Sequence, residues 1–226
     1  MRNVHISVNT AGIISSIAEQ DSKLYDQGIS KTDCLMRQFK MTLLQSGLQF
    51  SYLHESLKYM PREKSIVVPI VLDCFTRAEN VKDRQQLLRW LHFKGLYEAV
   101  PVLLDEFKYN SLCGDTLYLW AVAETLYQIK CPLFVSDYLS IACNPKYGIS
   151  RQMIVLLLGT IKSSDSVLTL MSLLSDDDIT LHVITALGKI GDRRCVSRLE
   201  EYIDSQKTII RKEAQRAILR INAISQ

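Results

Sequence analysis

Hydrophobic residues recur with the period of an α-helix along most of the chain, and the pattern is clearest between residues 167 and 221. Residues 167–192 (VLTLMSLLSDDDITLHVITALGKIGD) and 196–221 (VSRLEEYIDSQKTIIRKEAQRAILRI) each contain one helical pattern, a polar break and a second helical pattern. In the first copy the second pattern places Ile179, Val183 and Leu187 on one face of a helix. Neither helix can bury its apolar stripe alone, so the sequence predicts antiparallel helix pairs that stack on one another.

The break between the two helices of each pair is acidic, as in Ser175-Asp176-Asp177-Asp178 of the first copy. Side-chain oxygens at such a position can accept hydrogen bonds from the first N–H groups of the next helix. The three aspartates also raise the hypothesis of a metal site. A hard cation needs six or more converging oxygens, so we interpret them as helix caps that also favour the helix dipole.

The same pattern extends upstream at longer intervals. The central apolar residue of the second helix, which we call the anchor, would be Leu91, Leu126, Leu158, Leu187 and Ile218, at steps of 35, 32, 29 and 31 residues. Such steps suit one helix pair per repeat. A valine is expected at the start of each first helix, at Val100, Val135, Val167 and Val196.

This register predicts the domain organisation. Residues 1–32 are expected to form an irregular or short helical lead-in, and 33–226 a repeat domain with degenerate pairs over 33–61 and clearer pairs over 66–94, 99–130, 133–162, 167–190 and 196–222. Within the first of the clearer pairs, helices are expected over 66–75 and 81–93. Pro69 would then lie in a first turn, where proline is tolerated.

One motif carries a family resemblance. The run Ala186-Leu187-Gly188-Lys189-Ile190-Gly191-Asp192, followed by Val196 and Leu199, resembles the short HEAT-like repeat first described in phycobilisome (PBS) lyases. Ile210-Arg211 fits the Val-Arg of that family, whereas the first copy has Ile179-Thr180. The resemblance implies an all-α fold, a right-handed α-solenoid (superhelix) of antiparallel HEAT-like helix pairs whose second helices line the concave side. It implies no activity, because this repeat serves adaptors, regulators, lyases and DNA-repair proteins.

Composition narrows the class of protein without naming a ligand. Of 226 residues 47% are hydrophobic, which is too apolar for a disordered chain, and the net charge of +3 is too small to indicate nucleic acid by itself. No run of 18 apolar residues occurs, so no membrane span is expected, and the N-terminus lacks the apolar core of a secretory signal. Six cysteines without CxxC spacing are typical of reduced thiols, which favours a cytoplasmic protein.

Motifs of catalysis and cofactor binding are missing from the sequence. There is no GxxxxGK[ST], GxSxG or GxGxxG. His54-Glu55 begins like HExxH, but Lys58 stands where the second zinc ligand is needed. We therefore expect no enzymatic activity, no cofactor and no metal.

Polar and aromatic residues of the second helices form the candidate partner surface. Seven residues before the anchors lie Arg84, Arg151 and Arg211, which either bind the preceding turn or a neighbouring repeat, or form a ladder suited to phosphate or carboxylate groups. Trp120 beside Tyr127 is either a binding hot spot or packed between repeats. The candidate contact residues are Arg84, Arg89, His92, Trp120, Glu124, Tyr127, Arg151, His182, Lys189, Arg211, Lys212 and Arg216.

Two functions of different classes follow. The first is a non-enzymatic protein–protein interaction module, that is, a scaffold, adaptor or regulator, which would hold its partner on Trp120, Tyr127, Arg89 and His92. The family resemblance includes immunity-type proteins in this class. The alternative is a nucleic-acid-binding protein related to HEAT-like DNA-repair glycosylases, but a strongly basic face and a catalytic Asp beside Trp are missing. In the alternative, phosphates would be contacted by Arg84, Arg151, Lys189, Arg211 and Arg216. A bilin lyase or cofactor chaperone is suggested by the family name alone.

Overall fold

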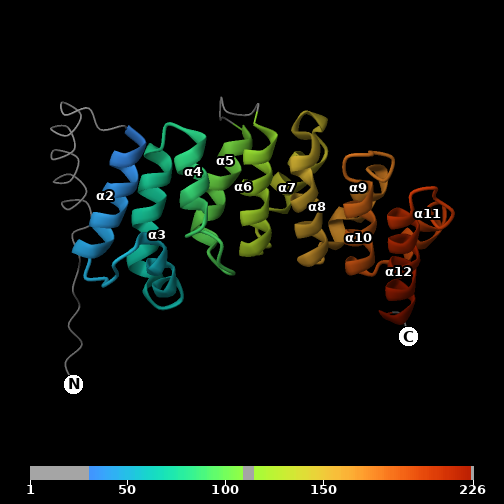
Figure 1. The fold of residues 1–226 in the computed structure, drawn as a ribbon. Coiled ribbons are helices and arrows are strands. Elements are labelled where there is room, and N and C mark those ends of the chain that lie inside the picture. Colours follow the sequence, from blue (N-terminus) through green and yellow to red (C-terminus); the bar gives the residue numbers. More distant parts are fainter. Residues whose placement is uncertain (1–30, 109–114, 225–226) are drawn as a thin grey trace, which may run out of the picture. The chain divides into compact units, whose positions relative to one another are not determined.

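The computed structural model describes residues 31–108 and 115–224, and these are helical almost throughout (Figure 1). No β-strand occurs in these ranges, so the predicted all-α class is confirmed. The lead-in predicted over 1–32 lies outside the described residues except for its last two positions. The chain divides into two compact units, residues 1–93 and 94–226, and each is described by itself. The handedness of the predicted superhelix stays a prediction.

The first unit contains α2 (Lys31–Gln45), the 3₁₀ helix η1 (Leu53–Tyr59), α3 (Met60–Arg77) and α4 (Val81–Leu88). Its core joins Phe39 of α2 to Phe75 of α3 and to Trp90 beyond α4, all nearly inaccessible to solvent. The Trp90 ring meets Phe39 edge-on at 5.0 Å, and its indole N–H donates to Ser56 Oγ at 2.8 Å. Trp90 is therefore a structural residue.

Two predicted helix boundaries in this unit are wrong. Helix α3 begins at Met60 rather than Ile66, with non-helical torsion angles at Glu63, so Pro69 lies in the helix interior. Proline is accepted there because Ser65, whose carbonyl loses its partner, is exposed and can bind water. Helix α4 ends at Leu88 instead of Phe93, since the following amides turn back to carbonyls three residues earlier.

The second unit is built from two layers of helices. The first layer contains α5 (Val100–Lys108), α7 (Val135–Ala142), α9 (Val167–Ser172) and α11 (Val196–Glu200). The second layer contains α6 (Thr116–Ile129), α8 (Arg151–Thr160), α10 (Thr180–Ile190) and α12 (Thr208–Ile224). Each helix of the first layer packs on its successor in the second, and second-layer helices lie side by side in chain order (Figure 1). The four predicted valines each begin a first-layer helix, as expected.

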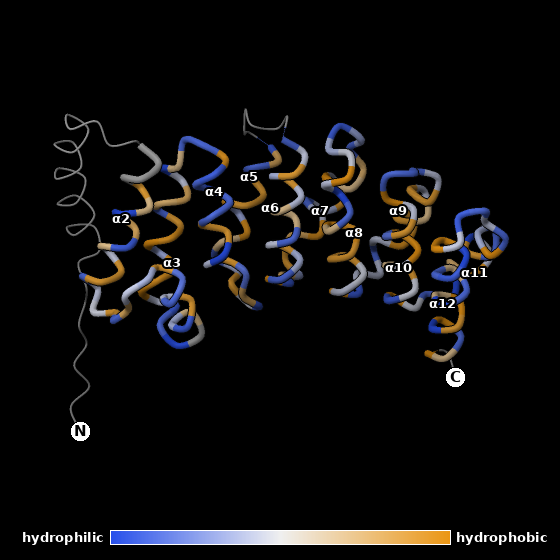
Figure 2. The backbone as a smooth tube through the Cα atoms, in the orientation of Figure 1, coloured by the Kyte–Doolittle hydropathy of each residue, from blue (hydrophilic) through white to orange (hydrophobic). Residues whose placement is uncertain are grey.

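Short 3₁₀ helices precede α5, α8, α9 and α11. They are η2 (Tyr97–Ala99), η3 (Pro145–Ser150), η4 (Ser164–Ser166) and η5 (Arg193–Cys195). Hydrophobic and hydrophilic residues recur along the helices of the unit (Figure 2), and α8 is hydrophobic without interruption from Met153 to Leu158. The apolar sides meet between the layers, where the anchors Leu126, Leu158 and Leu187 are fully buried.

Backbone conformation repeats with the same register. A residue with positive φ stands four positions after successive anchors, at Gly95, Lys130, Lys162 and Gly191, with φ of 81°, 58°, 53° and 82°. The left-handed residue directly follows α6 and α10, stands two positions after the end of α8 and seven after the end of α4, and precedes the next first helix in each case. Because these residues are 35, 32 and 29 positions apart, the backbone supports the spacing inferred from the apolar anchors.

Glycine and alanine bring the second-layer helices into close contact. A Cβ atom added to Gly159 of α8 would lie 2.5 Å from Cα of Ala186 on α10. One added to Gly188 of α10 would lie 2.7 Å from Cβ of Ala217 on α12. Both glycines directly follow an anchor, and only a residue without a side chain fits there. At the same register position α6 carries Tyr127 and α12 carries Leu219.

We expect Gly159→Ala to destabilise the protein by about 1–3 kcal/mol, because the new methyl group collides with the backbone of α10 and outweighs the better helix propensity of alanine. The free energy of unfolding in denaturant measures the effect. Leu219→Ala is the matched control, since that register position on α12 is 68% exposed. A Gly159→Ala variant as stable as the original protein would contradict the close contact.

Candidate partner-binding surface

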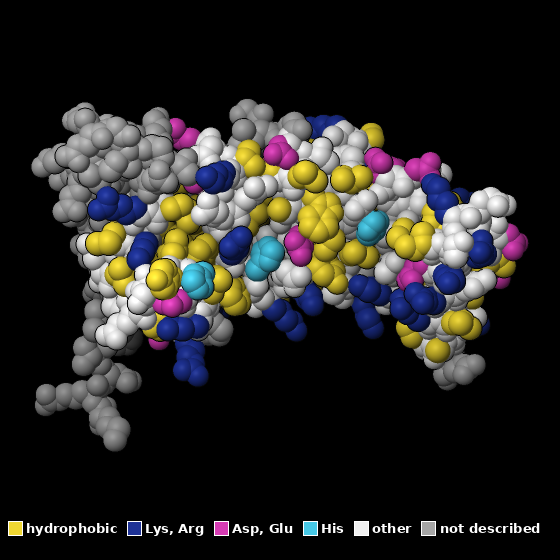
Figure 3. Space-filling model, in the orientation of Figure 1, with side chains coloured by type: hydrophobic (Ala, Val, Ile, Leu, Met, Phe, Trp, Pro, Cys, Tyr) yellow, Lys and Arg dark blue, Asp and Glu magenta, His cyan; other side chains and the backbone are white. Residues whose placement is uncertain are grey.

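The solvent-facing side of the second layer, which we call the second-layer face, is a set of half-buried residues at helical spacing. On α6 these are Trp120, Glu124 and Tyr127, and on α10 they are His182, Thr185 and Lys189. Residues i, i+3 or i+4 and i+7 share one side of a helix, so each set forms a stripe. On α8 the corresponding residues are Met153, Leu156 and Thr160. Figure 3 shows hydrophobic side chains gathered over α6 and α8, with Lys and Arg more frequent over α12.

Trp120 is the large aromatic residue of this face. Its neighbours Leu119, Val122 and Leu126 fill the core and are at most 1% exposed, so the core does not need the indole. Trp120 itself is half-buried, and within the described ranges its indole N–H has no acceptor. This arrangement differs from that of Trp90, which is buried and hydrogen bonded. Of the two interpretations left open by the sequence, the structure agrees with an accessible side chain that a partner could cover.

Tyr127 joins three repeats at one point of the face. Lys130 Nζ lies 5.8 Å and Lys189 Nζ lies 5.7 Å from the centre of its ring. Lys189 Nζ also donates to Oγ1 of Thr160 at 3.3 Å. Burial alone would raise the pKa of the Tyr127 phenol, but the hydrogen bond with Thr160 and the charges of Lys189 and Lys130 outweigh it and hold that pKa below its usual value. Two cations therefore flank one phenol.

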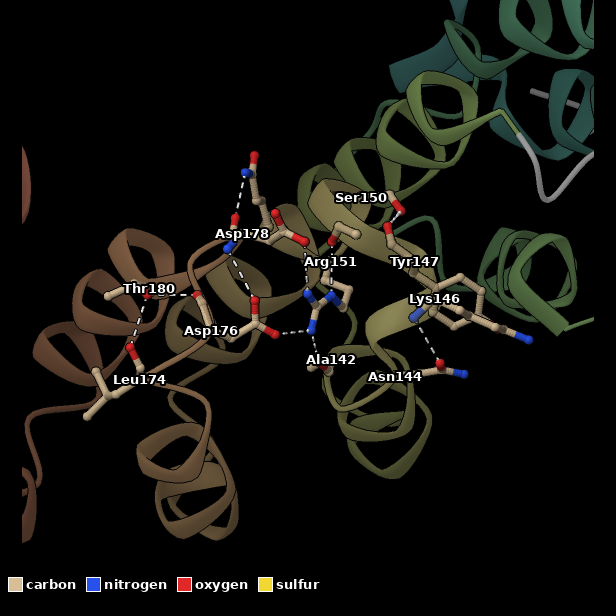
Figure 4. Close-up of polar contacts among 12 residues, drawn as sticks. Ala142, Asn144, Lys146, Tyr147, Ser150, Arg151, Leu174, Asp176, Asp178 and Thr180 are labelled. Carbon is tan, nitrogen blue, oxygen red and sulfur yellow. Dashed lines mark hydrogen bonds and ion pairs between the residues drawn. The ribbon is translucent and has the colours of Figure 1, made fainter.

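Arg151 was expected to contact a partner, and this prediction is wrong. Its side chain is 1% exposed, and its guanidinium donates to Asp176 Oδ2 at 2.7 Å and to Asp178 Oδ2 at 3.5 Å (Figure 4). It also donates to the carbonyls of Gly148 and Ala142 at 2.9 and 3.3 Å. The hydrogen bond from Arg151 lowers the pKa of Asp176. Arg151 thus fixes the repeat of α7 and α8 to the acidic turn of the next repeat.

The acidic turn has a different role from the one predicted. Ile179, not an aspartate, stands at the N-cap of α10, and no side chain caps that helix. Asp176 and Asp178 instead bind Arg151, and Asp177 pairs with Lys207 of the following repeat at 2.7 Å. In the part of the chain that the structure describes, no group of three His, Cys, Asp or Glu side chains could hold a metal ion. The aspartates therefore link repeats through ion pairs.

Residues at the register position of Arg151 also donate hydrogen bonds to the preceding turn in other repeats. Arg84 Nε donates to the carbonyl of Ala78 at 2.9 Å, and Arg211 Nη1 donates to that of Ser205 at 2.8 Å. Thr180, which replaces arginine in its repeat, donates to a carbonyl six residues earlier in the same way, at 3.0 Å. The structure therefore favours the first interpretation of these arginines, in which they hold the turn, over a guanidinium ladder.

The remaining predicted residues lie in three places. Arg89 is exposed and His92 half-buried, and both follow α4 in the first unit, whereas the second-layer face consists of second-unit residues alone. Lys212 and Arg216 are exposed on α12. Arg216 shares Glu213 with Arg220, at 3.6 and 3.5 Å. Two of the four basic residues of α12 thus share its one carboxylate.

His182 is the histidine of α10 on this face. Burial lowers its pKa, and its Nδ1 is a buried atom without a hydrogen-bond partner in the described structure. Protonation would place a charge in a site that does not solvate it. His182 is therefore held in its neutral form at pH 7.

Most of the described cysteines are buried. Cys74, Cys131 and Cys195 are buried and Cys143 is exposed, and all four are free thiols. Burial raises the pKa of Cys74 to about 12 and that of Cys195 to about 11, so neither is a thiolate at neutral pH.

Sequence reasoning missed Lys130 and Thr160. Thr160 stands two residues after its anchor, as Lys189 does after the next anchor, so alignment of the repeats would have placed the two side by side. Lys130 follows the helix in a left-handed conformation that is usually taken by glycine, and no sequence pattern indicates it.

The two layers, the recurring step of about 30 residues and the side-by-side second helices define an α-helical repeat protein. The family model of HEAT repeats matches residues 139–219, so this part of the chain consists of HEAT repeats. No curated protein matches the chain. HEAT repeats are generally protein-interaction scaffolds and typically lack enzymatic activity. No helix in the described ranges is long and apolar enough to cross a lipid bilayer.

We expect Arg151→Met to lower the free energy of unfolding by about 3 kcal/mol, because it leaves Asp176 and two carbonyls without their buried donor. Denaturant titration checks this. Arg198→Met, which breaks an exposed ion pair with Glu201, is the control and should cost less than about 1 kcal/mol. Equal small losses in both variants would show that Arg151 does not join the repeats.

The lowered pKa of His182 predicts a loss of stability in acid. The ordinary pKa of histidine is 6.5, and as the pH falls below this value His182 takes up a proton in the unfolded chain before it does so in the folded one. The free energy of unfolding therefore decreases. In His182→Gln this part of the decrease should vanish, whereas His54→Gln, at an exposed position, should retain it. Thermal melts between neutral and mildly acidic pH provide the measurement. A His182→Gln variant with the original pH dependence would contradict the assignment.

Proposed function

We propose that the chain is a non-enzymatic interaction module, a HEAT-repeat scaffold, adaptor or regulator, that binds a partner protein on the second-layer face. The observation that carries this proposal is Trp120, half-buried with an indole N–H that has no acceptor in the described structure, on a face of side-by-side helices. Tryptophan is enriched among the interface residues whose truncation to alanine costs about 2 kcal/mol or more of binding free energy. A partner that covers the Trp120 ring and accepts a hydrogen bond from its N–H would gain binding free energy both from the buried apolar area and from the hydrogen bond.

The rigidity of the face supports the same function. Trp120, Leu156 and His182 stand on three neighbouring helices whose mutual position is fixed by buried anchors and, from α8 onward, by glycine contacts. A partner therefore meets a surface that is already ordered, and binding costs less conformational entropy than on a loop. Enzymatic activity is no part of the proposal, because HEAT repeats typically lack it.

Nucleic-acid binding has less support from the contacts. Arg84, Arg151 and Arg211, which would neutralise phosphates, donate to carbonyls and carboxylates of the chain itself. Arg216 and Arg220 share Glu213. Few guanidinium groups thus remain for a phosphate backbone, whose binding depends on many such contacts. We also propose that the protein acts in the cytoplasm, a reducing compartment, because the described cysteines are free thiols.

A pull-down with the tagged full chain tests the function. We expect a protein to be retained in stoichiometric amount with or without nuclease, and to be lost with Trp120→Ala because the central contact is removed. Leu168→Ala is the matched control, since Leu168 is a 64% exposed apolar residue on the first-layer helix α9. Retention of nucleic acid released by moderate salt, or loss of the protein with Leu168→Ala and not with Trp120→Ala, would contradict the proposal.

A further inference from the structure

The cations around Tyr127 have no counter-ion in the described structure. Neither Lys130 nor Lys189 takes part in an ion pair there, although Lys189 is half-buried. Lys207 offers a comparison, because its ammonium group meets Asp177 at 2.7 Å on the same unit. Glu124 lies one turn before Tyr127 on α6 and pairs with neither lysine. Two positive charges therefore lie beside one aromatic ring without a carboxylate partner in the described structure.

The ammonium groups of Lys130 and Lys189 can both donate a hydrogen bond to an oxygen anion, and they come from the turn after α6 and from α10. Thr160 on α8 is not a free donor, because its hydroxyl group donates to the carbonyl of Leu156 at 2.8 Å and accepts from Lys189 at 3.3 Å. Thr160 thus holds the Lys189 ammonium group beside Tyr127. Ionised acceptors form stronger hydrogen bonds with ammonium groups than neutral ones do, so the arrangement suits a carboxylate.

Lys130 differs from its counterpart in the next repeat by its contact with Tyr127. Its φ of 58° is the left-handed conformation that Gly95, Lys162 and Gly191 also occupy at this register position, so the backbone alone does not single it out. The Lys130 side chain, however, lies over the Tyr127 ring, 5.8 Å from Nζ to the ring centre. This contact, rather than the backbone conformation, assigns Lys130 to the surface.

We propose that Lys130 and Lys189, which lie beside Tyr127 and Thr160 in what is here called the Tyr127 site, bind a carboxylate side chain of an acidic protein segment, while Trp120 covers an apolar residue of the same segment. This inference rests on the proposed function and specifies the chemistry of its partner. Trp120 and Tyr127 are seven residues apart on α6, or about 10 Å along the helix axis. The segment would therefore carry Asp or Glu three residues from an apolar residue if extended, or seven residues from it if helical.

An acidic protein segment fits this surface better than a nucleic acid. Beside the two lysines the face carries Trp120 and Leu156, which are apolar, and Glu124, which would repel a row of phosphates. A single carboxylate next to an apolar residue matches that mixture of charge and hydrophobic surface. A polyanion would need a continuous basic stripe.

Selection from a phage-displayed library of random dodecapeptides on the immobilised full chain tests the inference. Peptides enriched on the original chain should carry Asp or Glu at the stated distance from an apolar residue. Fluorescence anisotropy then gives the Kd of the strongest fluorescein-labelled peptide. We expect the Kd to rise about tenfold or more with Lys189→Gln and with Lys130→Gln, and to rise with salt, because the ion pair is lost or screened.

The control is Lys162→Gln, a lysine with the same left-handed conformation one repeat later, which should leave the Kd unchanged. Circular dichroism melts confirm that each variant folds. Peptides without acidic residues, or a Kd unaffected by both lysine substitutions, would overturn the acidic preference. If Trp120→Ala still abolished peptide binding in that case, the proposed function would be retained without the acidic preference. Peptide binding that is insensitive to Trp120→Ala as well would contradict both the acidic preference and the proposed function. If a labelled single-stranded oligonucleotide bound the Tyr127 site more tightly than the selected peptide, the ligand would be a nucleic acid and not a protein segment.

Discussion

The close contact between glycine and alanine on neighbouring second-layer helices is the constraint on which the second unit depends. Gly159 meets Ala186 and Gly188 meets Ala217 so closely that a single methyl group has no room. This distance sets the spacing of α8, α10 and α12, and with it the position of each first-layer helix that packs on them. The ion pairs of Arg151 with Asp176 and Asp178 act between the same repeats, on the turns rather than on the helices. Packing and charge thus fix neighbouring repeats at two separate places.

The candidate surface lies where this close packing is replaced by a different contact. At the register position of the two glycines α6 carries Tyr127, whose ring reaches Lys189 on α10 and approaches Lys130 after its own helix. A bulky phenol in place of glycine brings polar groups of three repeats together and leaves them at the surface of the second layer. Trp120 stands two turns earlier on the same stripe of α6, so one helix supplies both the aromatic and the polar part of the surface. We infer that departures from the repeat consensus, rather than the consensus itself, carry the specificity of this chain.

The sequence predicted the repeat well because the repeat depends on local, periodic information. The anchors Leu126, Leu158 and Leu187 are buried as expected, and the valines at their predicted positions begin the first-layer helices. Prediction failed where the outcome depends on contacts between distant residues. The partner of Arg151 is 25 residues away, and nothing near it in sequence shows that its guanidinium is buried. Boundaries in the first unit failed for a related reason, since Pro69 is accepted inside α3 because Ser65, whose carbonyl loses its partner, is exposed.

The chain contains two tryptophans, and this offers the most direct test of the central claim that a partner binds the second-layer face. In a ¹⁵N-labelled sample each indole N–H gives its own resonance, and Trp90→Phe assigns them. The account predicts that saturation with the retained partner or the selected peptide shifts the Trp120 indole resonance, while the Trp90 resonance, held by Ser56 in the core, stays in place. A shift confined to Trp90, or no shift of Trp120 at saturation, would contradict it.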